Sequence, residues 1–163
     1  MIRRLCLIAS LLAAGVTAIP AQEAKAAAVA TEAQVEGMLF FASDKAEAPP
    51  QKEKVVIEPD LLKDVTARLG KAFDKYPHFH LIGRHTQKVF KEYESWVVPS
   101  QDLCLKMDSR GPAQGGGVNL HLQLWQDKKV LVKSDIVIRK DRPVFLGGPG
   151  WRGGRLIFVV VLK

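Results

Sequence analysis

The clearest hydrophobic pattern along the chain predicts a helix over residues 59–76. Its apolar positions recur at spacings of three and four and form one stripe: Leu61, Leu62, Val65, Leu69, Ala72, Phe73 and Tyr76. Pro59 suits the first turn of a helix, and Pro77 ends it because proline has no backbone N–H for the next hydrogen bond. Such a stripe is buried in a folded protein, so we expect this helix to pack against another layer.

A second pattern predicts a β-rich chain after Pro77, with short apolar runs separated by turn residues. We expect strands at 78–84, 87–91, 95–98, 102–108, 117–125, 129–139, 143–146 and 155–162. Several alternate between apolar and polar residues, as half-buried strands do. Residues 156–162 are apolar on both faces, which indicates a central strand. We expect it beside an earlier strand at 37–42, whose apolar centre is 38–41.

The connections between these strands indicate antiparallel neighbours. Residues 126–128 predict a tight hairpin, whereas 110–117 and 147–154 are longer, glycine-rich turns. Consecutive strands joined by short turns pair antiparallel. The sequence therefore predicts an α+β fold with one strand, one crossover helix and then an antiparallel β-meander, arranged in two layers.

The N-terminus has the build of a secretory signal peptide. Arg3 and Arg4 precede an apolar run of about 15 residues, which is shorter than the roughly 20 needed to cross a membrane. We expect cleavage after Ala21, with Ala18 and Ala26 as alternatives. The prediction is therefore an exported bacterial protein, periplasmic or secreted, with no transmembrane segment after cleavage.

Three parts follow from these patterns. Residues 1–21 are the predicted signal peptide, and 22–54 hold an alanine-rich tether, the first strand and a linker with Pro49 and Pro50. Residues 55–163 form the α+β domain, to which we assign the first strand as well. Cys104 is the single cysteine left after cleavage, so we expect no internal disulfide.

The basic and acidic residues are unevenly distributed along the chain. The 163 residues carry 24 Lys and Arg against 17 Asp and Glu, a net charge of +7. Residues 128–163 alone hold nine basic and two acidic residues, also +7, whereas 22–127 hold 13 basic and 15 acidic residues. Lysines and arginines on a sheet edge prevent unwanted strand pairing, and they also form a contact surface for an acidic partner.

The basic residues at the C-terminal turns are therefore our candidate binding site. It comprises Lys128, Lys129, Arg139, Lys140 and Arg142, together with Trp151 and Arg152 on a glycine-rich turn. Trp151 either contacts a ligand or folds back over the sheet edge. With 7% aromatic residues and no basic recognition helix, an exported protein of this kind is not expected to bind nucleic acid.

Histidines and the cysteine are the remaining chemical candidates. His78 and His80 share one strand face, with His85 nearby and His121 on a later strand, and three histidines are a known zinc ligand set. However, no carboxylate or cysteine stands at a diagnostic spacing, so His78, His80 and His121 are weak metal candidates. Cys104 lies in mid-strand, where a structural cysteine is the simpler interpretation.

Familiar catalytic signatures are missing. Residues 148–153 match G-x-G-x-x-G, but a strand follows instead of the helix that dinucleotide binding requires. No P-loop, G-x-S-x-G or H-E-x-x-H motif is present, and we expect no cofactor.

Strand and turn motifs in the second half of the chain carry a resemblance. They are Trp96 to Ser100 (WVVPS), Leu120 to Gln126 (LHLQLWQ), Pro143 to Pro149 (PVFLGGP) and Arg152 to Ile157 (RGGRLI). The stretch from Tyr76 to Leu162 resembles a group of uncharacterised small exported bacterial proteins, a domain of unknown function. The resemblance implies export and assigns no activity or catalytic residue.

These observations favour a non-enzymatic exported domain that binds a protein or an acidic cell-envelope component. The alternative is a small metal- or Cys/His-dependent hydrolase built on His78, His80, His121 and Cys104. Convergence of those four side chains in one pocket would favour the hydrolase.

Overall fold

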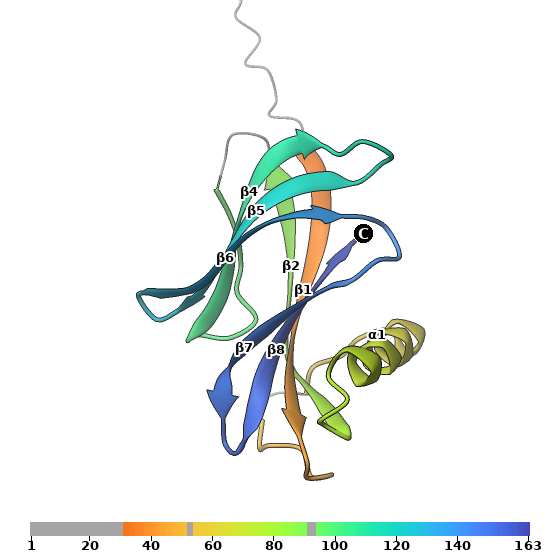
Figure 1. The fold of residues 1–163 in the computed structure, drawn as a ribbon, viewed down its shortest axis with the longest axis vertical. Coiled ribbons are helices and arrows are strands. Elements are labelled where there is room, and N and C mark those ends of the chain that lie inside the picture. The colour runs from red at the N-terminus through yellow and green to blue at the C-terminus, as the bar shows by residue number, and fades with distance from the viewer. Residues whose placement is uncertain (1–30, 52–53, 91–93) are drawn as a thin grey trace, which may run out of the picture.

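The computed structural model describes residues 31–51, 54–90 and 94–163 (Figure 1). Its elements, in chain order, are β1 (Thr31–Ser43), α1 (Pro59–Ala72), β2 (His78–Phe90), β3 (Glu94–Val97), β4 (Leu103–Pro112), β5 (Val118–Gln126), β6 (Lys129–Ile138), β7 (Val144–Trp151) and β8 (Gly154–Leu162). The predicted signal peptide, its cleavage points at Ala18, Ala21 and Ala26, and most of the tether lie outside the described residues.

The strands form two antiparallel four-stranded sheets. The first sheet has the order β2-β1-β8-β7, and the second has the order β3-β4-β5-β6. The predicted pairing of the two most apolar runs is confirmed, since Phe40 lies opposite Ile157 in the β1–β8 pair. In the described residues, mostly antiparallel sheet with one helix agrees with the α+β class.

A core between the two sheets holds them together. Inward-facing residues of β1 and β8 meet the alternating leucines of β4 and β5. The buried members include Val35, Leu39, Phe158, Val160, Leu103, Leu105, Met107, Leu120, Leu122 and Leu124. Gly37 allows a close approach of the two sheets, because a Cβ built there would lie 2.1 Å from Val97 Cγ1 of the second sheet. Burial of this kind stabilises a fold by about 25 cal/mol for each Å² of apolar surface.

Helix α1 covers the opposite face of the first sheet (Figure 1). Val65 and Leu69 are its fully buried residues, and they pack against a cluster that includes Met38, Phe40 and Val159. The helix is therefore a third layer, where the sequence predicted two. It also ends earlier than predicted, because Phe73 leaves helical geometry while its N–H still donates to Leu69 O at 2.8 Å. In the part of the chain described, no helix is long and apolar enough to span a membrane.

The predicted single meander is replaced by two sheets. β3 to β6 do follow one another as neighbours, but β7 and β8 return to the first sheet beside β1. The strands predicted at 78–84 and 87–91 are one strand, β2, with an irregularity where Ile82 bulges. The glycine-rich segment 147–154 is also mostly strand, and its turn is confined to residues 152–153. These differences arise from pairing between distant segments, which local turn patterns do not report.

Candidate functional site

The candidate site is centred on β6, the outermost strand of the second sheet. β6 pairs with β5 from Gln126↔Lys129 at one end to Val118↔Ile138 at the other. Among the described strands it has no partner on its outer side. An edge strand of this kind leaves about half of its N–H and C=O groups facing outward.

Six cationic side chains surround this strand, and we call them with β6 the cationic edge. They are Lys128, Lys129, Lys133, Arg139, Lys140 and Arg142. All are exposed except the partly buried Arg139, whose guanidinium donates to Gln114 O at 3.2 Å. Within the described ranges, none of the six forms an ion pair. Asp127, Asp135 and Asp141 lie on the same segment, so residues 127–142 carry six basic and three acidic residues, a net charge of +3, and no ion pair within the described chain holds the cations.

The structure separates the five basic residues that the sequence grouped. Lys128 and Lys129 lie at the β5–β6 turn, whereas Arg139, Lys140 and Arg142 follow the far end of β6. A strand of ten residues is about 30 Å long at about 3.4 Å per residue. The cations thus form two groups at opposite ends of one strand, with Lys133 between them. Sequence reasoning missed Lys133 as a member, although it lies in the middle of the strand.

Exposed apolar side chains also lie on β6. Val132 is 36% exposed and Val137 is 38% exposed. Val132 pairs with the inward-facing Leu124, whereas Val137 pairs with Asn119 on the outer face of the sheet. The edge therefore offers an apolar contact on each face of the second sheet.

Trp151 and Arg152 lie at the turn between β7 and β8. The Trp151 ring contacts Phe41 edge to face at 5.1 Å, and the Arg152 guanidinium lies 4.5 Å above the indole. Trp151 also packs on the core between the sheets, so it folds back over the sheet. Arg152 is exposed, with a positive φ of 48° at the tight turn.

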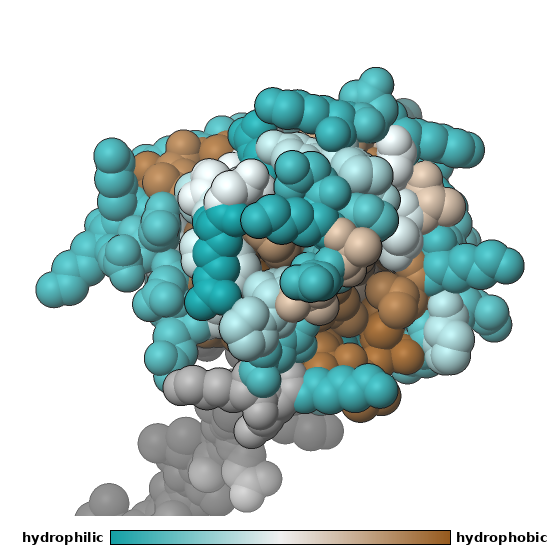
Figure 2. All heavy atoms as spheres, turned by 90° about the horizontal axis from the view of Figure 1, so that it is seen from below, coloured by the Kyte–Doolittle hydropathy of each residue, from teal (hydrophilic) through white to brown (hydrophobic). Residues whose placement is uncertain are grey.

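A cavity of about 410 Å³ opens at this end of the sandwich. Leu39, Leu103 and Leu156 form its apolar wall, and Trp151 and Asp127 also line it. The β5–β6 turn, with Lys128, therefore lies near Trp151. Figure 2 views the molecule from this end and shows apolar surface in gaps between hydrophilic side chains.

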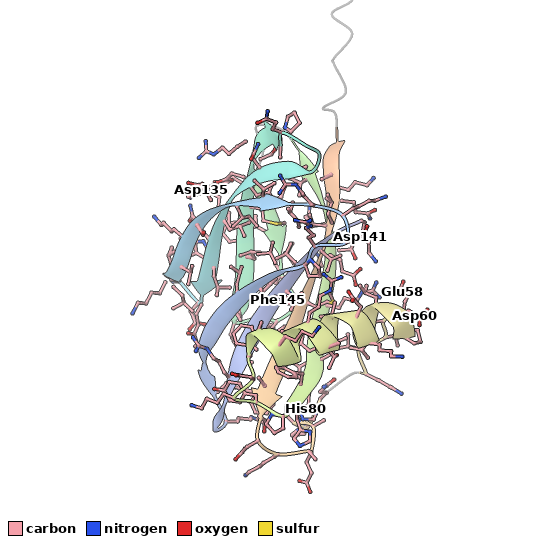
Figure 3. All side chains as sticks on the ribbon, turned by 45° about the vertical axis from the view of Figure 1, so that its right-hand side comes forward. Glu58, Asp60, His80, Asp135, Asp141 and Phe145 are labelled. Carbon is pink, nitrogen blue, oxygen red and sulfur yellow. The ribbon has the colours of Figure 1, made fainter. Side chains whose placement is uncertain are left out.

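The histidines do not converge with Cys104. His78 and His80 lie on the first sheet, with their rings nearly parallel and 6.4 Å apart, and His80 faces the same side as Phe41. His121 lies on the outer face of the second sheet, where its Nδ1 is 2.7 Å from an Asp135 carboxylate oxygen. Figure 3 shows Asp135 and His80 at opposite ends of the molecule.

His85 and Cys104 also make contacts that are typical of structural residues. His85 Nδ1 accepts a hydrogen bond from the N–H of Val98 at 3.2 Å, which links β2 to the end of β3. Cys104 shares the outer face of the second sheet with Trp125, and burial raises the pKa of its thiol. In the described ranges, no three His, Cys, Asp or Glu side chains are placed to hold a metal ion.

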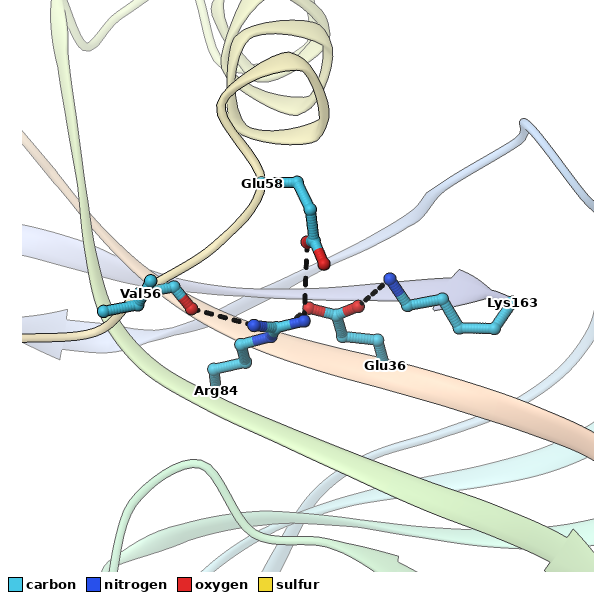
Figure 4. A network of polar contacts seen from close by, with 5 residues as sticks. All are labelled: Glu36, Val56, Glu58, Arg84 and Lys163. Atoms are coloured by element: carbon cyan, nitrogen blue, oxygen red, sulfur yellow. Dashed lines mark hydrogen bonds and ion pairs between the residues drawn. The ribbon is translucent and has the colours of Figure 1, made fainter.

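A buried ion network that the sequence analysis did not find joins β1, β2 and the start of α1 (Figure 4). Glu36 is fully buried, and its Oε1 accepts a hydrogen bond from Arg84 Nε. Lys163 Nζ lies 2.5 Å from the other carboxylate oxygen. Arg84 also donates to Val56 O at 2.8 Å and lies 3.5 Å from Glu58. The available signal was a charged residue between Val35 and the apolar run of β1.

The network perturbs the ionisation of its members. The hydrogen bond to Glu36 raises the pKa of Arg84. A hydrogen bond from its own backbone amide lowers the pKa of Glu58, and the nearby charge of Lys163 acts in the same direction. These side chains fasten α1 and the C-terminal residue to the first sheet, and we assign them a structural role.

Comparison with known proteins gave no match: no family model, no curated protein and no solved structure is similar to this chain.

Proposed function

We propose that this protein is an exported, non-enzymatic binding domain that holds an acidic protein or cell-envelope component on its cationic edge. The observation that carries the proposal is the set of six cations around β6 that make no ion pair in the described residues. Export rests on the signal-like segment at 1–21.

Electrostatic complementarity is the physical basis of this binding. Unpaired cations on an exposed surface attract an acidic partner and accelerate its encounter with the protein. Such binding weakens as salt is added, because charges more than about 8 Å apart are screened at physiological ionic strength. The hydrolase alternative has less support, since His121 and Cys104 lie on the second sheet and His78 and His80 on the first.

Five lysine and arginine substitutions test the proposal. In the edge variant, Lys128, Lys129, Arg139, Lys140 and Arg142 are each replaced by glutamine. The control variant carries five lysine-to-glutamine changes at exposed sites outside β6 and its flanking turns, at Lys45, Lys54, Lys63, Lys71 and Lys75. Both variants lose the same formal charge, so net charge alone cannot separate them.

Binding to poly-L-glutamate is measured at low and physiological salt, alongside capture of components from the native cell envelope. We expect at least a tenfold loss of poly-L-glutamate affinity for the edge variant, equal to about 1.4 kcal/mol, and at most a twofold loss for the control. Equal losses in the two variants, or no loss in the edge variant, would contradict the proposal.

A further inference from the structure

We propose that the acidic partner binds as an extended polypeptide segment that adds a strand to the second sheet alongside β6. This inference rests on the proposed function of the cationic edge and specifies its partner. Binding by strand addition supplies affinity through backbone hydrogen bonds and selectivity through neighbouring side chains.

The backbone of β6 has the length and the freedom that strand addition requires. β6 runs for ten residues, and its inner side pairs with β5 along its length except at one irregularity, where Leu131 has no partner. Its outer side has no strand partner in the part of the chain described. A segment of seven to ten residues fits along a strand of about 30 Å. Added backbone hydrogen bonds then replace those that the edge makes with water.

The other sheet edges in the described chain are less suited to this role. On the β2 edge, the linker lies close enough for the Gln51 side-chain amide to donate to Leu81 O at 3.0 Å. β3 has only four residues. β7 contains Pro149, which has no N–H to donate, and its pairing with β8 is irregular between Gly147 and Gly150. β6 is therefore the one edge there that is long, free of proline and without a neighbour.

Side chains on β6 select the partner's chemistry. The cations at both ends of the strand favour a segment with acidic residues, and they repel a second copy of the same edge. Asp135 is the acidic residue within β6, and its carboxylate contacts His121 on β5, away from the free edge. Val132 and Val137 offer apolar contacts on the two faces, so an acidic segment that also contains aliphatic residues fits best.

The experiment uses the full protein and two peptide probes of the same sequence. One probe is a decapeptide of alternating glutamate and valine, and the second has N-methyl groups at every residue. Methylation removes the N–H groups of both peptide edges while keeping its charge and apolar side chains. Affinity is measured by isothermal titration calorimetry, and amide hydrogen exchange is followed along β6.

Strand addition predicts at least tenfold weaker binding of the methylated peptide, with slowed exchange of β6 amides by the unmodified peptide alone. Amides of the β2 edge serve as the internal control and should not change. Equal affinity of the two peptides without protection of β6 would overturn strand addition and leave the cationic edge as an electrostatic site. Failure of both peptides and of poly-L-glutamate to bind would overturn the proposed function itself.

Discussion

Replacing Arg84 with methionine should destabilise the protein by about 2–3 kcal/mol, because it removes a cation from a buried carboxylate. Breaking a buried ion pair by removing one partner costs about 3–5 kcal/mol. Two features reduce that figure here. The Arg84 side chain is 26% exposed, and Lys163 remains beside Glu36 at 2.5 Å.

The double variant Glu36→Leu with Arg84→Met distinguishes buried charge from lost packing. It removes both charges and fills their space with apolar groups, while Lys163, which loses its partner Glu36, has a side chain that is 33% exposed to water. We therefore expect stability within about 1 kcal/mol of the natural protein. Arg68→Met is the matched control, since Arg68 pairs with Asp64 across one turn of α1 and both side chains are at least 41% exposed. We expect that control to lose less than about 0.5 kcal/mol.

Urea denaturation followed by tryptophan fluorescence measures these differences, because Trp96, Trp125 and Trp151 report on both sheets. The free energy of unfolding is extrapolated from the midpoint and the slope. A loss in Arg84→Met no larger than in the Arg68 control would refute the reasoning. So would a double variant at least as unstable as Arg84→Met.

Other predictions concern packing, reactivity and pH. Gly37→Ala should lower stability by about 1–3 kcal/mol in thermal unfolding, because its Cβ would overlap Val97. Gly70→Ala should raise stability by up to about 1 kcal/mol, because its Cβ would lie in open space on α1. Cys104 should react slowly with iodoacetamide at pH 7.5 and faster at higher pH, since burial raises the thiol pKa; rapid stoichiometric labelling at pH 7.5 would contradict this. A hydrogen bond from Lys106 lowers the pKa of Glu94. The ionised Glu94 therefore contributes stability above the ordinary glutamate pKa of about 4.3, and this stability is lost as pH falls through the lowered pKa. The urea midpoint of Glu94→Gln should therefore fall less on acidification than that of the natural protein, and parallel curves would show that the pair has no such effect.

The fold was predictable where one local pattern decides it. The apolar stripe of α1 has helical spacing. Ile157 and Phe40 lie in runs that are apolar on both faces, which is typical of strands covered on both sides. The division into two sheets was not predictable in this way. The turns at Asp127 and Arg152 are equally tight, yet one joins neighbours in the second sheet and the other joins neighbours in the first.

The candidate site shows the same limit. Composition located the basic residues, but strand register decides that Lys129 and Arg139 lie at opposite ends of β6. The partner of Glu36 lies 48 residues away in the sequence, at Arg84. Spacing along the chain cannot identify such a pair, because it forms only when β1 and β2 align.

The order of strands in the first sheet makes the pairing of β1 with β8 a late step in folding. β8 lies between β1 and β7, and Met38 pairs with Val159, roughly 120 residues later in the chain. Contacts between such distant segments form slowly, since a long loop must close before they add any stability. Hairpins of the second sheet have only short loops to close and can form earlier. The sheet surface on which α1 packs is complete only once β8 has paired with β1. We therefore expect the protein to be sensitive to proteases until β8 has paired.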